Sequence, residues 1–262
     1  MTRKLLLSLL ILTSLTWADT FDKPVRRQTV DLGPSPSGPG ATAKVKCYFF
    51  PEFMVKEVDM GEVGAERLGI LPVTPSSSGK CVKAADAEEK VIGSDAWSGY
   101  FMGVKKNYVF FGAADRINSS LPFAVFDAGT GKKVFEDSAK AEITFAALAD
   151  GSFLMSYLRV VGEDCFILKE AGCWERMRNR YGLGNAAAPD CRKGYAASAE
   201  FLAKDRCSEK KEKIACMARE TPLALSQMEQ SPSVISYPVE VTLGAVPVVK
   251  VLAGEVRCWP AD

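Results

Sequence analysis

The sequence predicts a mainly β protein made of antiparallel hairpins, sandwich-like or partial-propeller-like, with a disulfide-rich α-helical insertion. Three observations support this prediction. Short aromatic and β-branched runs, punctuated by Gly, Asn and Asp, fill Trp97–Ser138. The chain then becomes polar, cysteine-rich and helical in pattern at about 163–230, and strand character returns at Tyr237. The helical segment is therefore expected to interrupt a β domain.

The stretch Trp97–Ser138 is expected to form the central sheet. Apolar runs lie on both sides of a turn at Lys105–Asn107, and two further runs flank the turn at Asp127–Lys133. Short apolar segments separated by turn residues predict consecutive β-hairpins. Ser152–Val161 is apolar on both faces, which predicts a strand covered on both sides.

Further strands are expected on either side of this stretch. Val82–Val91 is ambiguous, because its charged pattern fits either a helical turn or an edge strand. The other expected strands are Lys44–Phe50, Met54–Asp59, Arg67–Val73, Glu142–Leu148, Ser152–Val161, a strand from Tyr237, Val248–Leu252 and Glu255–Trp259.

The insertion at about 163–230 is expected to hold three or four helices. The candidates are Gly172–Tyr181, Pro189–Arg206 and Ser208–Arg219. Thr221 followed by Pro222 is typical of an N-cap and a first helical position, which predicts a fourth short helix through Gln230.

The cysteines predict four disulfides. Their number is even, and an export signal leads to an oxidising compartment. Five of them lie in the insertion, so at least one must pair with Cys47, Cys81 or Cys258 in the β part. Cys207 and Cys216 flank a short segment and are the best local pair, while the remaining connectivity stays open. The eight are Cys47, Cys81, Cys165, Cys173, Cys191, Cys207, Cys216 and Cys258.

The N-terminus has the pattern of a signal peptide over residues 1–18. Arg3 and Lys4 precede an apolar run, Leu5–Leu15, and small residues favour a cut after Ala18. The run spans about 16 Å as a helix, too short for a bilayer. We therefore expect a periplasmic or secreted protein with no integral membrane segment after cleavage. Residues 19–43, rich in Pro, Gly and Ser, predict a flexible linker, and 44–262 a single β-rich domain.

The amino-acid composition excludes several kinds of catalytic and binding site. The chain has no histidine, so a Ser-His-Asp site, a Cys-His site and a His-ligated zinc cannot form. If every cysteine is bridged, no thiolate nucleophile remains. We expect no metal and no cofactor. With 33 basic and 32 acidic residues, the chain lacks the charge excess of a nucleic-acid-binding protein.

Two local resemblances are present. Residues 123–135, with an Asp-Ala-Gly-Thr-Gly-Lys turn between apolar runs, resemble the hairpin found once per blade in quinoprotein-type β-propellers. A propeller repeats this unit, whereas this chain has a single copy, so no quinone cofactor is carried over. Phe53–Asp59 together with Trp97–Ser138 is also similar to uncharacterised exported proteins of proteobacteria, a resemblance that implies export and no particular activity.

The leading functional hypothesis is non-enzymatic binding of a protein or an envelope component. Trp174, Arg176, Arg180 and Tyr181 in the insertion are residue types enriched at binding hot spots, so we expect the contact surface there. One alternative is a carboxylate-based glycan hydrolase, which requires two Asp or Glu roughly 5–10 Å apart across a cleft. Another is a small-ligand carrier with a large apolar pocket inside the β domain. The sequence does not identify the partner or the oligomeric state.

Overall fold

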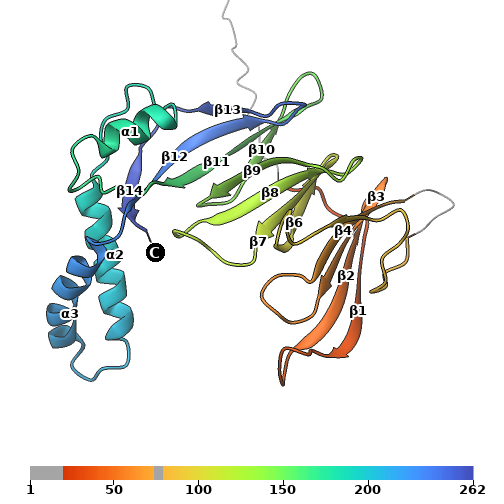
Figure 1. Ribbon diagram of the computed structural model, residues 1–262, viewed down its shortest axis with the longest axis horizontal. Helices are drawn as coiled ribbons and strands as arrows, with labels where there is room; N and C mark the ends of the chain where they lie inside the picture. Colours follow the sequence, from red (N-terminus) through yellow and green to blue (C-terminus); the bar gives the residue numbers. More distant parts are fainter. Residues whose placement is uncertain (1–19, 74–78, 262) are drawn as a thin grey trace, which may run out of the picture.

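The computed structural model describes residues 20–73 and 79–261, in which the chain forms two antiparallel sheets and a helical insertion (Figure 1). These residues contain strands β1 to β14 and helices α1 to α3. The predicted mainly β fold with a disulfide-rich helical insertion is confirmed. The predicted signal peptide, 1–18, lies outside the described residues.

The first sheet has five strands in the order β1-β2-β3-β4-β5, each antiparallel to its neighbour. Buried and half-buried residues alternate along β2, as the two-residue period of a strand requires when one face is covered more fully than the other. The strands are β1 (Arg26–Pro34), β2 (Thr42–Phe49), β3 (Phe53–Asp59), β4 (Arg67–Pro72) and β5 (Lys90–Ile92).

Strand β1 corrects the prediction that residues 19–43 form a flexible linker. Its backbone pairs with β2 from Arg26, opposite Phe49, to Pro34, opposite Thr42. The strand is mostly exposed and polar, so it lacks the apolar pattern by which strands are recognised. The Pro, Gly and Ser residues that suggested a linker are concentrated in the turn between β1 and β2.

The second sheet has nine strands, and the predicted hairpins of Trp97–Ser138 form much of it. Its main path runs β13-β12-β11-β9-β8-β7-β6, while β10 pairs with β11 and β14 pairs with β12. The strands are β6 (Gly99–Lys105), β7 (Tyr108–Ala113), β8 (Leu121–Asp127), β9 (Lys133–Ala139), β10 (Thr144–Ala147), β11 (Phe153–Gly162), β12 (Ser233–Thr242), β13 (Val248–Val251) and β14 (Arg257–Pro260).

The nine-stranded sheet contributes to a core on each face. The neighbouring residues Phe110 and Phe111 of β7 point to opposite faces, and both are fully buried. Phe111 packs with residues of the five-stranded sheet such as Val55, whereas Phe110 packs with Phe123 and Phe145 on the other side. Aromatic residues at successive positions of these hairpins are therefore explained by two cores.

The insertion contains three helices, α1 (Cys173–Arg180), α2 (Cys191–Arg206) and α3 (Lys213–Met228). The first two match the predicted helices. The separate fourth helix opened by Thr221 and Pro222 is wrong, because Pro222 lies inside α3. The Cys207–Cys216 bridge fixes the first half of α3, and fully buried Ala224 anchors its second half. No helix among the described residues is long and apolar enough to cross a membrane.

All eight cysteines are bridged, as predicted. The pairs are Cys47–Cys81, Cys165–Cys173, Cys191–Cys258 and Cys207–Cys216. The predicted local pair, Cys207–Cys216, is confirmed. Cys191–Cys258 is the predicted bridge between the insertion and the β part, and it joins the first residue of α2 to β14.

The two bridges near α2 are expected to differ in their effect on stability. Cys191–Cys258 spans 67 residues and Cys207–Cys216 spans 9. From loop closure, replacing the first pair by Ser should lower the free energy of unfolding by about 4 kcal/mol, and the second by about 2.5 kcal/mol. Denaturant unfolding of the two double variants measures this difference. Equal losses in the free energy of unfolding, or a larger loss for the variant without Cys207–Cys216, would contradict the loop-closure explanation.

Candidate functional site

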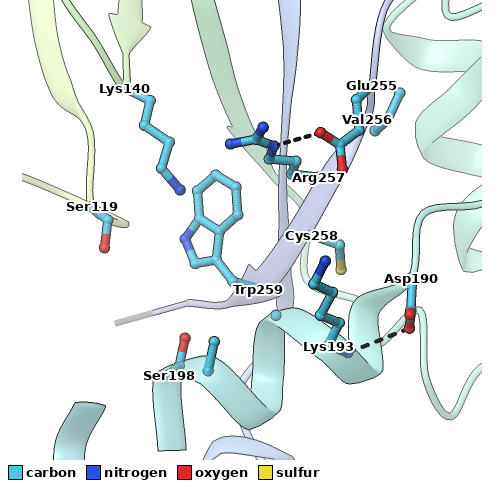
Figure 2. Close-up of a pocket in the computed structure, with 12 residues that line it drawn as sticks. Ser119, Lys140, Asp190, Lys193, Ser198, Glu255, Val256, Arg257, Cys258 and Trp259 are labelled. Carbon is cyan, nitrogen blue, oxygen red and sulfur yellow. Dashed lines mark hydrogen bonds and ion pairs between the residues drawn. The ribbon is translucent and has the colours of Figure 1, made fainter. Parts of the chain in front are cut away.

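A pocket of about 560 Å³ lies where α2 meets the C-terminal strand β14 (Figure 2). Four segments far apart in the sequence line it. Ser119 comes from the loop before β8, and Lys140 follows the end of β9. Residues 190–198 come from the start of α2, and residues 255–259 lead into β14.

Close contact between α2 and β14 sets the shape of this pocket. Cys191 and Cys258 are bonded, with their Cα atoms 4.7 Å apart. Gly194 lies one turn later, and a Cβ at that position would stand only 1.7 Å from the carbonyl oxygen of Cys258. Glycine is therefore required here by the approach of two backbones, although glycine inside a helix normally costs stability.

Substituting Gly194 tests this contact. In an ordinary helix, Gly→Ala raises stability by about 1 kcal/mol. Here Gly194→Ala should lower it by about 1–3 kcal/mol, because the added methyl group overlaps backbone that the disulfide holds in place. Thermal unfolding measures the change. Gly244→Ala is the matched control, since a Cβ there meets nothing within 4 Å. A Gly194→Ala protein as stable as the wild type would show that the helix can shift.

Lys140 is the unusual charge in the pocket. Its Nζ lies 3.4 Å from the centroid of the Trp259 ring. Figure 2 shows the lysine side chain pointing toward that ring. Among the described residues, no carboxylate pairs with this ammonium group. Burial and then the nearby charge of Arg257 lower the pKa of Lys140 from its ordinary value. The lysine is thus partly desolvated, beside a second cation and without a counter-ion.

Trp259 forms the floor beneath this lysine. Only 7% of it is exposed, and it packs on Val160 and Val234 of β11 and β12. Its Nε1 donates to the carbonyl oxygen of Asn118 at 3.3 Å, so the plane of the ring is fixed. The backbone N–H of Lys140 donates to the carbonyl oxygen of Leu158, which fixes the other partner of the cation–π contact.

The remaining charges leave the pocket positive. Glu255 pairs with Arg257 at 2.9 Å, and Asp190 caps α2 by accepting from the backbone N–H of Lys193. Lys193 is exposed and has no ion pair within the described part of the chain. Both carboxylates are thus already engaged, while two of the three cations are not. The positive end of the α2 dipole adds to the same field.

The residues predicted as hot spots lie elsewhere, at α1. Trp174 is only 9% exposed and belongs to the main core, so little of its side chain is available to a partner. Arg176 pairs with Glu170 at 3.1 Å, and Arg180 pairs with Glu163 at 3.0 Å.

Tyr181 joins the second of these pairs. Its hydroxyl donates to Oε1 of Glu163 at 2.7 Å. Burial and then this hydrogen bond raise the pKa of Tyr181. The structure therefore brings Arg180 and Tyr181 together on Glu163, while Arg176 points to a different partner. These contacts fasten α1 to the end of β11, and they account for both exposed guanidinium groups.

Three carboxylates with almost completely buried side chains bear on the hydrolase alternative. They are Glu57, Glu89 and Asp137. Each has a cation beside it: Glu57 pairs with Lys46, Glu89 with Lys56, and Asp137 with Arg159. Asp137 also accepts from the hydroxyl of Tyr157, whose pKa is raised by burial and then by the charge of Asp137. Ion pairing within the fold explains all three positions without catalysis.

A second groove, of about 510 Å³, bears on the carrier alternative. It is lined by apolar side chains of Val25, Phe50, Phe53 and Val104, together with Lys106 and others. The groove lies between residues 22–25 of the N-terminal segment, residues 50–53 of the five-stranded sheet and residues 104–107 of the nine-stranded sheet. The space between the two sheets is filled by aromatic and aliphatic core side chains.

Comparison with protein-family models, with curated proteins and with solved structures finds no match. The geometry of the pocket therefore carries the functional argument. Sequence reasoning missed Lys140 and Trp259 as a pair, because nothing in the order of residues links positions 140 and 259. The one available signal was Cys258, which precedes Trp259 and was one of three cysteines, with Cys47 and Cys81, expected to bridge to the insertion.

Proposed function

We propose that this chain is an exported, non-enzymatic binding protein, and that its pocket between α2 and β14 receives an anionic group of an envelope component. One observation carries the proposal. Lys140 is held over the Trp259 ring beside Arg257, with no carboxylate partner among the described residues. The signal-peptide pattern of the N-terminus and the four disulfides support a location in the periplasm or outside the cell.

Burial and a neighbouring cation both destabilise the charged form of Lys140. A partly buried ammonium group loses hydration, and the adjacent guanidinium of Arg257 repels it. The Trp259 ring offsets part of this cost through its negative face. A ligand anion would offset the rest, because it would face both cations at once. Burial first, and then the charge of Arg257, lower the pKa of Lys140, and a bound anion would act in the opposite direction.

The side chains favour an oxyanion. A carboxylate, sulfate or phosphate group accepts hydrogen bonds from both ammonium and guanidinium groups, and such charge-assisted bonds are short and strong. Arg257 pairs with Glu255 through its Nε alone, so its two terminal nitrogens are left to donate, while Lys140 supplies a point charge. Lys193 and the N-terminus of α2 add positive potential from the opposite wall.

Removing the lysine charge should weaken anion binding. Lys140→Gln should raise the dissociation constant for inorganic phosphate about tenfold, the effect of losing one charge-assisted hydrogen bond. Titration followed by the NMR signal of the Trp259 indole N–H measures binding at the pocket itself. Lys204→Gln is the control, because Lys204 is an exposed lysine on α2 that does not line the pocket. Equal affinities for Lys140→Gln and the wild type would refute the proposal.

The affinity should also depend on pH. A lysine with a lowered pKa in the free protein loses its proton at a pH below the ordinary value of about 10.5. Because the bound anion favours the charged form, phosphate affinity should fall as pH rises through the pKa of Lys140. Arg257 stays charged over this range. Lys140→Arg should keep its affinity to higher pH, as calorimetric titration would show. Parallel pH profiles for the two proteins would count against Lys140.

A further inference from the structure

The anion pocket continues into a second groove, of about 630 Å³, with a different character. The two cavities share Ser119, Ala197, Ser198 and Trp259 in their walls, so they adjoin along α2, and we refer to the two together as the channel. The first part ends at the cations described above. The second part is lined largely by apolar side chains from α2, α3 and the C-terminal residues, among them Phe201, Leu202, Met228 and Pro260.

Phe201 is the exposed aromatic side chain of this groove. It lies on α2 one turn after Ala197 and is 76% exposed. A phenylalanine that borders a concave apolar surface, and is not covered by the fold, marks a surface suited to an apolar group. Trp259 separates the two parts of the channel, because it lies under Lys140 in one cavity and also lines the other.

We propose that the channel binds a single-chain anionic lipid, whose charged head lies at Lys140 and Arg257 and whose alkyl chain lies along Phe201, Leu202 and Met228. This inference rests on the proposed function, and it names the ligand class for the same site. The cations Lys140 and Arg257 favour the charged head group in the first cavity. The second cavity adjoins the first through the four shared residues, so the alkyl chain can extend from the head group into it.

A lipid fits the groove better than a peptide does. A bound peptide backbone has polar groups at every residue, and these need hydrogen-bond partners when they are buried. The polar side chains in this part of the channel are those of Ser119, Ser198, Gln227 and Ser231, and Gln227 already accepts from Arg206 at 2.9 Å. A peptide backbone lying along the groove would need more partners than these. An alkyl chain needs no polar partner and gains from contact with Phe201 and its neighbours. The insertion thus supplies the wall for the chain, and the β part supplies most of the head site.

The test uses the disulfide-bonded chain and three probes below their micelle concentration: dodecanoate, acetate and dodecyltrimethylammonium. Dodecanoate combines the head with the chain, acetate has the head alone, and the third probe has the chain with the wrong charge. Calorimetry should show dodecanoate binding at least about tenfold more tightly than either of the others, because only dodecanoate uses both parts of the channel.

Two variants locate the alkyl chain. Phe201→Ser should weaken dodecanoate binding about tenfold while leaving inorganic phosphate affinity unchanged, because phosphate does not reach Phe201. Ile214→Ser is the matched control: Ile214 is 88% exposed on α3, outside the channel, so neither affinity should change. Both substitutions alter exposed side chains, so the fold should be preserved.

The outcomes separate this inference from the proposed function. If phosphate binds through Lys140 but dodecanoate binds no more tightly than acetate, the lipid inference is overturned and the anion site stands. Tighter binding of a peptide with a free carboxyl terminus than of dodecanoate would also overturn it, in favour of a protein ligand. Absence of binding by phosphate, acetate and dodecanoate alike would remove both.

Discussion

The junction of α2 with β14 is the constraint on which the candidate site depends. Cys258 pairs with Ile235 in the sheet and is bonded to Cys191 at the start of the helix. Gly194 then lets the helix backbone lie directly against the strand. Trp259 and Arg257 flank Cys258, so one covalent bond places the ring and the guanidinium beside the helix. The long helical insertion is therefore held to the sheet at its base (Figure 1).

Buried charges elsewhere in the described chain are balanced by partners within the fold. Lys56 pairs with Glu89, and both side chains are almost fully buried. Arg159 pairs with Asp137 at 2.9 Å. A buried charge with no partner is costly, so pairing of this kind is the expected state. Lys140 is only half-buried, and the groups facing it are an aromatic ring and another cation rather than a carboxylate. The difference between Lys140 and these paired cations is the reason for proposing an anion site in this pocket.

Local patterns predicted the elements that depend on local forces. Turn residues mark the hairpins of Trp97–Ser138, and helices α1 and α2 begin and end close to the expected residues. The odd number of cysteines in the insertion required a bridge to the β part. Strand β1 was missed because backbone pairing with β2 holds it, and few of its side chains are buried. The unbroken α3 was missed because its packing outweighs the tendency of Pro222 to start a helix. The site joins positions 119, 140, 190–198 and 255–259, which only the tertiary structure brings together.

Pairing of charges also favours the junction of α2 with β14, rather than the outer surface of the insertion, as the proposed anion-binding site. Arg176 and Arg180 are well exposed and have the right chemistry for a contact surface, but Glu170 and Glu163 already neutralise them. Binding a partner there would break one ion pair to form another, with little net gain. Within residues 20–73 and 79–261, Lys140 has no such pair to lose, so an anion that reaches it adds a new interaction. Where charged side chains are equally available, the cation without a partner has the most to gain from a ligand.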